Sequence, residues 1–189
     1  MQVPGPIRIL GIDPGSRITG FGIIDSDGRK SVHVASGCIR AGDAPLPERL
    51  RVIFREVQQI VAEYRPAAVA VEQVFMARNA DSALKLGQAR SAAICATFDG
   101  HAEVFEYAAR AIKQAVVGIG HADKAQVGHM VAVLLNHRDA LPVDASDALA
   151  VALCHAHTRP LTARLAALPM VDGAPLQFRR RTTGRGLRR

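Results

Sequence analysis

The feature that most constrains the fold is an apolar segment interrupted by one acid, "ILGIDPGSRITGFGIID", which runs from Ile9 to Asp25. Two runs with the composition of β-strands, 7–13 and 18–25, flank a Pro-Gly-Ser turn, a pattern typical of a hairpin. The first run ends on Asp13. A carboxylate placed there is presented at the edge of a sheet, where many folds keep their functional groups.

The rest of the pattern indicates an α/β protein. A third strand is predicted over 31–40, a helix over 46–65, and a buried strand that ends on a second acid, Glu72. The further elements expected are a helix that begins at Asn79 or Asp81 and runs to about Phe98, a strand over 102–108, and helices over about 107–116, 122–135 and 145–157. Pro160, Pro169 and Pro175 are expected to mark the end of packed structure. The order predicts a five-stranded mixed sheet flanked by helices on both faces.

Length and composition indicate one intracellular domain. The chain has 189 residues, of which 49% are hydrophobic, enough for a substantial core. It has no apolar run of membrane length and no signal-like start, so we expect a cytoplasmic protein without a membrane partner. Its three cysteines, Cys38, Cys95 and Cys154, fit neither a zinc site nor a disulfide framework, and we expect buried free thiols.

The positive charge lies almost entirely at the end of the chain. The formal net charge is +7, and residues 158–189 hold eight arginines against one acid, so residues 1–157 are neutral overall. We therefore predict a folded domain over 1–157 and a basic, disordered tail over 158–189. If the folded domain binds a polyanion, it must do so through a local basic patch or through metal ions.

A third acidic cluster opens the segment "PVDASDALAVALCHAH". Asp144 and Asp147 are three residues apart, which makes them neighbours on one face of a helix. Taken alone, this pair is explained by an N-cap and a favourable first-turn acid. The two acids also accompany Asp13 and Glu72, each of which ends an apolar strand.

Four acids that converge on a hydrophobic scaffold would repel one another unless cations offset them. Oxygen ligands with water in the remaining positions suit Mg²⁺, with Mn²⁺ as a substitute. Two such ions about 4 Å apart are the arrangement that drives in-line phosphodiester hydrolysis. His155 and His157 are two residues apart on a helix and so do not share a face. The pattern thus favours a site for two Mg²⁺ ions over a zinc site.

Four segments resemble the RuvC-type Holliday-junction resolvases: "LGIDPGSRITGFGII", "VEQVFMARNADSALKLGQAR", "VFEYAARAIKQAVVGIGHADKAQV" and "DASDALAVAL". They occur in the family's order between about Ile7 and His157. The resemblance implies a ribonuclease-H-like fold, a homodimer, cooperation with a branch-migration motor, and Mg²⁺-dependent paired nicking of four-way DNA junctions in recombination and repair. It also implies that the metals are held at the positions of Asp13, Glu72, Asp144 and Asp147.

Residues near the acids are candidates for DNA contact. Phe75 follows Glu72 by three residues, and the resemblance associates it with displaced bases; a core or lid residue is the alternative. Lys113 and Lys124 flank a glycine-containing segment before a helix start, where backbone N–H groups bind phosphate readily. The resemblance assigns both lysines to DNA, although each singly fits a solvated surface residue. Further basic residues that could extend this patch are Arg78, Lys85 and Arg90.

Small side chains recur every four residues in the second predicted helix, at Ala83, Gly87, Ser91 and Cys95. Such a stripe lets another helix approach closely. An internal helix is the ordinary partner, whereas the resemblance favours a second subunit. Two related sites would suit the symmetric cutting of a junction.

Two other functions fit parts of the sequence. Nucleotide-binding proteins of the actin-like superfamily begin with a similar "GIDPGS" strand and turn, but 189 residues leave no room for their second half. A non-catalytic junction-binding protein of the same fold would be expected to lack at least one of the four acids, and all four are present.

Overall fold

The computed structural model describes residues 5–73 and 79–166, with side chains described as far as Arg159. Its centre is a five-stranded sheet in the order β3-β2-β1-β4-β5. The first three strands form an antiparallel meander, and β4 and β5 join parallel to β1. This confirms the predicted mixed sheet.

The predicted elements are all present, with ends that differ by a few residues. The strands are β1 (Ile7–Asp13), β2 (Ile18–Ser26), β3 (Ser31–Arg40), β4 (Ala68–Glu72) and β5 (Glu103–Tyr107). The helices are α1 (Leu46–Tyr64), α2 (Ala80–Cys95), α3 (Ala109–Val117), α4 (Lys124–Leu134) and α5 (Val143–Ala166), with a short 3-10 turn at Phe98–Gly100.

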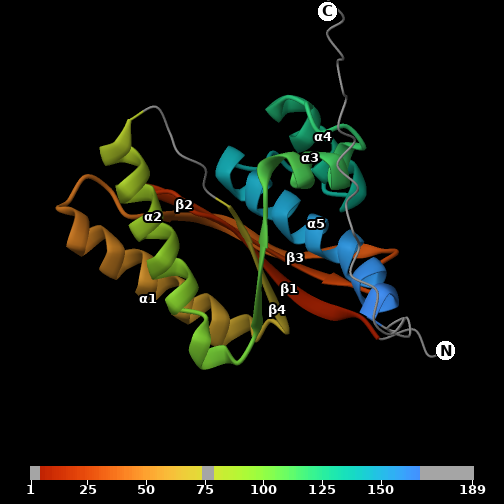
Figure 1. Cartoon of the computed structure of the whole chain (residues 1–189), viewed down its shortest axis with the longest axis horizontal. Helices are drawn as coiled ribbons and strands as arrows, with labels where there is room; N and C mark the ends of the chain where they lie inside the picture. The colour runs from red at the N-terminus through yellow and green to blue at the C-terminus, as the bar shows by residue number, and fades with distance from the viewer. Residues whose placement is uncertain (1–4, 74–78, 167–189) are drawn as a thin grey trace, which may run out of the picture.

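Helices cover both faces of the sheet (Figure 1). On one face, α1 and α2 bury apolar side chains such as Ile53, Val57 and Ala93 against Leu10 and Ile12 of β1. On the other, α3, α4 and α5 form a second core over the alternate residues of the strands. The period of two along a strand therefore divides its side chains between two separate cores.

The close packing of α5 on the sheet sets the geometry of the site. A Cβ atom on Gly11 would overlap the carbonyl oxygen of Ala148, and one on Gly20 would overlap the carbonyl oxygen of Asp144. Glycine at these strand positions therefore lets the helix backbone touch the strands. Since Gly20 pairs with Asp13 across the hairpin, the contact brings the first turn of α5 beside the acidic end of β1.

Two expectations are corrected. The last helix does not end before Pro160 but continues through it to Ala166, since a proline removes one backbone hydrogen bond and can bend a helix without ending it. Of the cysteines, only Cys154 is buried, whereas Cys38 is partly exposed and Cys95 is exposed. In the described ranges no helix has both the length and the apolar composition needed to span a membrane.

Candidate metal and nucleic-acid site

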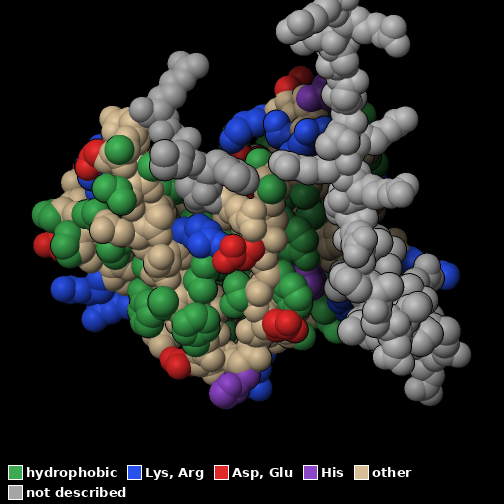
Figure 2. Space-filling model, viewed as in Figure 1, with side chains coloured by type: hydrophobic (Ala, Val, Ile, Leu, Met, Phe, Trp, Pro, Cys, Tyr) green, Lys and Arg blue, Asp and Glu red, His purple; other side chains and the backbone are tan. Residues whose placement is uncertain are grey.

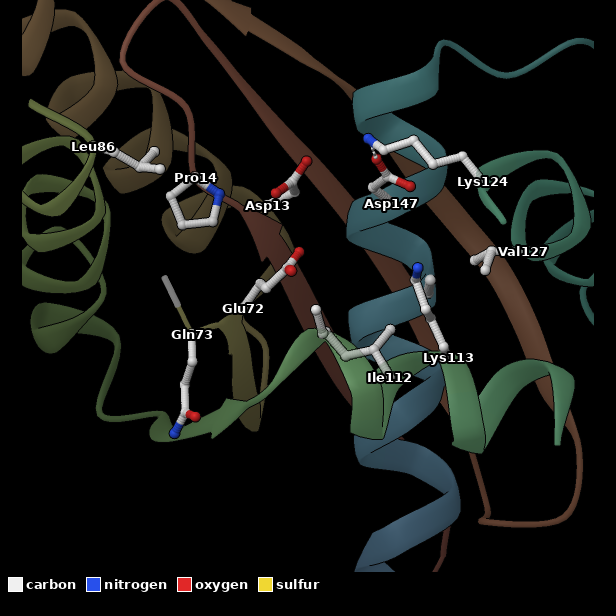
Figure 3. Close-up of a pocket in the computed structure, with 12 residues that line it drawn as sticks. Asp13, Pro14, Glu72, Gln73, Leu86, Ile112, Lys113, Lys124, Val127 and Asp147 are labelled. Carbon is white, nitrogen blue, oxygen red and sulfur yellow. Dashed lines mark hydrogen bonds and ion pairs between the residues drawn. The ribbon is translucent and has the colours of Figure 1, made fainter. Parts of the chain in front are cut away.

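Three of the four predicted acids meet at one edge of the sheet. Asp13 is the last residue of β1 and Glu72 is the last residue of β4, and these two strands are parallel neighbours. Asp147 approaches from α5. Figure 3 shows the three carboxylates around one opening, each carried by a different element. The prediction that distant parts of the sequence bring these acids together is confirmed for this trio.

The acids line a cavity of about 460 Å³. Lys113 and Lys124 lie on its α3 and α4 side, and both face the opening in Figure 3. The remaining lining residues, which sequence reasoning did not select, are Pro14, Gln73, Leu86, Ala109, Ile112, Val127 and Ala150. The cavity thus combines apolar walls with three acids and two lysines.

The pKa values of two of the acids, Asp13 and Glu72, are raised above their ordinary values. Burial, the largest cause, and the negative charges of Glu72 and Asp147 together raise the pKa of Asp13 to about 7. Burial and the charge of Asp147 also raise the pKa of Glu72. Ionised carboxylates this close to one another in a partly buried site are unfavourable without a cation, so the cluster has the electrostatics of a cation site.

The two lysines supply part of the missing positive charge. The ammonium of Lys124 lies 2.7 Å from an oxygen of Asp147, and this hydrogen bond raises the pKa of Lys124. Lys124 also opposes the rise in the pKa of Asp13, and both lysines oppose the rise in the pKa of Glu72. Both predicted DNA-contact lysines therefore lie at the acidic site.

Asp144 takes a different position from the other three acids. It lies one helical turn before Asp147, in the first turn of α5, and is not among the residues that line the cavity. Its charge nevertheless acts on Asp13 and raises the pKa of that carboxyl. It is the second residue of the helix, so it is not the N-cap that the alternative interpretation would require.

The oxygen donors fit a hard divalent cation better than zinc. Asp13, Glu72 and Asp147 offer carboxylates only, and Mg²⁺ is commonly held by one or two carboxylates with water and substrate oxygens in its other positions. Within 5–73 and 79–159, no three His, Cys, Asp or Glu side chains are close enough to form a ready-made metal cage.

The other predicted contact residues have mixed outcomes. Phe75 and Arg78 lie outside the described residues. Lys85 is partly exposed and pairs with Asp81 along α2, whereas Arg90 is turned inward and pairs with Glu106 of β5. Basic side chains gather over α3 and α4 in the view of Figure 2, next to the acidic opening.

The small-residue stripe of α2 faces away from the core. Ala89 and Ala93 are the buried residues of this helix, while Ser91 and Cys95 are exposed. A Cβ atom on Gly87 would meet nothing within 4 Å. The internal partner expected from the sequence is therefore absent along this stripe in the part of the chain that the structure describes.

Sequence reasoning also missed a buried arginine beside the site. Arg49 of α1 is 9% exposed and donates to the carbonyl oxygen of Ser16 at 2.7 Å, in the turn that follows Asp13. The burial of Arg49 could have been predicted from the helical period. Arg49 precedes Ile53 by four residues and Val57 by eight, which places it on the apolar face of the helix.

Comparison with known proteins gives the family. Residues 9–155 match the family model of "Crossover junction endodeoxyribonuclease RuvC". A protein of that name from Alkalilimnicola ehrlichii is 58% identical over 159 residues, which cover 84% of this chain and 96% of the relative. One from Pseudomonas aeruginosa is 60% identical over 151 residues, which cover 80% and 87%.

Solved structures agree with this result. The RuvC of Thermus thermophilus in complex with Holliday junction substrate has a TM-score of 0.78 and 33% identity, with 82% of this chain and 96% of that chain covered. The yeast mitochondrial Holliday junction resolvase Ydc2 has a TM-score of 0.62 at 9% identity, with 87% and 88% covered, a likeness in fold alone. The fold is ribonuclease-H-like, as expected. On the family match and the identity to these relatives, the chain belongs to the RuvC family of crossover junction endodeoxyribonucleases.

Proposed function

We propose that this protein is a Mg²⁺-dependent endonuclease that resolves four-way DNA junctions by paired, symmetric nicks. The observation that carries the proposal is the meeting of Asp13, Glu72 and Asp147 beside two lysines at one edge of the sheet. Family membership supports the same activity, since the relatives bear the name crossover junction endodeoxyribonuclease.

The acids are proposed to hold two Mg²⁺ ions, with Mn²⁺ as a substitute. Bound there, the ions would activate the attacking water and stabilise the leaving oxygen of an in-line displacement. The carboxylates of Asp13, Glu72 and Asp147 face the same opening in Figure 3, and Asp13 would hold the ions together with the other acids. Glu72 would complete one side and Asp147 with Asp144 the other, and the products would be a 5′-phosphate and a ligatable nick.

The surrounding residues would bind and orient the DNA. Lys113 and Lys124 are proposed to contact phosphates, which position a nucleic acid without reading its sequence. Phe75, three residues beyond Glu72, is proposed to stack on a displaced base, a contact worth about 1–3 kcal/mol per base. The apolar wall formed by Ile112 and Val127 would limit water around the scissile phosphate.

The remaining proposals concern assembly and location. The outward stripe at Ala83, Gly87, Ser91 and Cys95 is proposed to form a two-fold dimer interface, which would supply the two related sites that symmetric cutting needs. A branch-migration motor is proposed as a further partner, in the cytoplasm. We retain the division into a nuclease domain over 1–157 and a basic tail over 158–189, which could add loose phosphate contacts; the first part of this tail, as far as Ala166, continues α5.

Cleavage of two substrates tests the proposed function. A mobile four-way junction and a linear duplex of the same sequence are incubated with the protein, with and without Mg²⁺. We expect cuts only in the junction, placed symmetrically, and only with Mg²⁺. A protein that binds the junction and never cuts it would instead be the non-catalytic junction-binding protein, and equal cutting of both substrates would exclude junction selectivity.

A further inference from the structure

Arg90 connects three elements at the base of the site. It is carried by α2, and its Nε donates to the backbone carbonyl oxygen of Glu72 at 3.3 Å. Its Nη2 lies 2.6 Å from a carboxylate oxygen of Glu106 on β5. The Arg90 side chain is only 19% exposed, and Nη2 is buried. Since Nη2 makes no well-aligned hydrogen bond, Glu106 stabilises it through charge.

The contact falls where the pairing of β4 with β1 has ended, while the pairing of β4 with β5 continues. The ladder between β1 and β4 ends at the pair Ile12 and Val71, one residue before Glu72. On the other side, Tyr107 pairs with Glu72, and its carbonyl oxygen accepts from the N–H of Gln73 at 2.8 Å. Arg90 thus gives the Glu72 carbonyl a partner at the point where one of the two neighbouring strands has diverged.

The chemistry of arginine suits this place. Its Nε and Nη2 lie on one edge of a rigid, planar, charged group, so one side chain can donate a hydrogen bond from Nε while Nη2 attracts a carboxylate at a fixed separation. A lysine has a single ammonium on a flexible stem, so it could contact either the Glu72 carbonyl oxygen or the Glu106 carboxylate well, but not both. The pairing with Glu106 also keeps Arg90 turned toward β5. Little of its side chain is therefore exposed for the DNA contact considered from the sequence.

We propose that Arg90, held by Glu106, is a positioning residue that fixes the main chain of Glu72 so that its carboxylate faces Asp13. The inference rests on the proposed function, because it assumes that Glu72 is a metal ligand. Residues that orient a ligand change metal affinity or activity by about 10- to 100-fold when they are replaced. Arg90 acts on Glu72 only through the main chain, so the expected effect is at the lower end of that range.

The test compares Arg90→Lys and Glu106→Gln with Glu103→Gln, a matched control at an exposed acid of the same strand. The first measurement uses Mg²⁺ alone: the concentration that gives half of the Mg²⁺-induced rise in unfolding temperature, without DNA. The second is the Mg²⁺ concentration for half-maximal cleavage of a four-way junction. The third is junction affinity in Ca²⁺.

We expect Arg90→Lys to raise both Mg²⁺ midpoints by on the order of 10-fold and to leave junction affinity unchanged. Glu106→Gln should raise the midpoints less, and Glu103→Gln should not change them. The inference would be overturned if Arg90→Lys had the same Mg²⁺ midpoints as the wild-type protein, even if its unfolding temperature were lower. It would also be overturned if Arg90→Lys lowered junction affinity and left both Mg²⁺ midpoints unchanged. If Arg90→Lys does not fold, wild-type midpoints in Glu106→Gln overturn it. A wild-type protein that never cuts the junction would defeat the proposed function instead.

Discussion

The ammonium of Lys124 lies 2.7 Å from a carboxylate oxygen of Asp147, although the two residues belong to different helices. Lys124 is 75% exposed and Asp147 is 19% exposed, so a mobile cation reaches down to a half-buried acid. The acid that we assign to the metal and the lysine that we assign to DNA are therefore an ion pair in this structure. Lys124 therefore has two proposed roles, a phosphate contact and an ion pair with Asp147. Its replacement should change DNA binding and Mg²⁺ binding in opposite directions.

Lys124→Met should weaken junction binding and strengthen the binding of Mg²⁺ alone. Loss of one phosphate contact should reduce the slope of log affinity against log salt by about 1. Release of Asp147 removes a competitor for the metal, which lowers the Mg²⁺ concentration needed to stabilise the fold. Lys113→Met is the comparison, because Lys113 makes no hydrogen bond to an acid among the described residues and acts on Glu72 only through its charge: it should weaken junction binding similarly and strengthen Mg²⁺ binding less. An unchanged salt slope in both variants would remove the lysines from the interface.

Asp13→Asn should abolish cleavage while junction binding stays largely intact, because binding rests on phosphate contacts and shape. The same change should raise the stability of the metal-free protein by on the order of 1–3 kcal/mol, since it removes a buried carboxylate from two acidic neighbours. Urea unfolding in a chelator measures the second effect. Asp139→Asn, at an exposed loop acid, serves as the control. Cleavage by Asp13→Asn at near wild-type rate would contradict the assignment.

The buried side chain of His155 should make the free energy of unfolding depend on pH. The residue is 2% exposed, its Nδ1 lies 2.7 Å from the hydroxyl of Tyr107, and burial lowers its pKa to about 4. In the unfolded chain a histidine has a pKa near 6.5, so between about pH 6.5 and pH 4 the unfolded state binds more protons. Stability should therefore fall as the pH drops through this range, by on the order of 3 kcal/mol.

Urea unfolding at pH 7.5 and at pH 4.5 measures this loss. His155→Gln removes the titrating group and should flatten the dependence, whereas His129→Gln, at an exposed histidine of α4, should retain it. A dependence that is equally steep in all three proteins would show that other groups cause it.

Gly87→Leu should convert a dimer into monomers without unfolding them. A Cβ atom at this position meets nothing within 4 Å among the described residues, so we expect the added bulk to obstruct a second helix packed along the stripe. Gln88→Leu places the same apolar side chain at the neighbouring exposed position and is the control for its apolar character. Sedimentation at several concentrations measures the mass. If Gly87→Leu sediments as the wild-type protein does, the interface lies elsewhere.

Much of the fold was predictable because its signals are local. The strand that ends at Asp13 and the strand that ends at Glu72 are short apolar runs, and Asn79 caps the next helix as predicted. The approach of α5 to β1 depends on Gly11, whose role is visible only when the helix backbone lies against it. The continuation of α5 through Pro160 is likewise a property of the whole helix, not of one residue.

The site was predictable in part for the same reason. Asp13, Glu72 and Asp147 were found because each interrupts or opens an apolar element. Arg90 was considered from the sequence only as an extension of the basic patch, because its pairing with Glu106, sixteen residues away on another element, is a tertiary contact. The sequence pattern along α2 carries no information about Glu106, because that residue belongs to β5 and is brought to Arg90 only by the tertiary fold.

The most direct test of the central claim is anomalous X-ray diffraction from crystals of the protein grown with Mn²⁺ and a four-way junction. The claim is that the acids from β1, β4 and α5 share divalent cations. We expect two manganese peaks between Asp13, Glu72 and the Asp144–Asp147 turn, next to a DNA phosphate. A junction bound at this edge of the sheet with no manganese among these carboxylates would contradict the account.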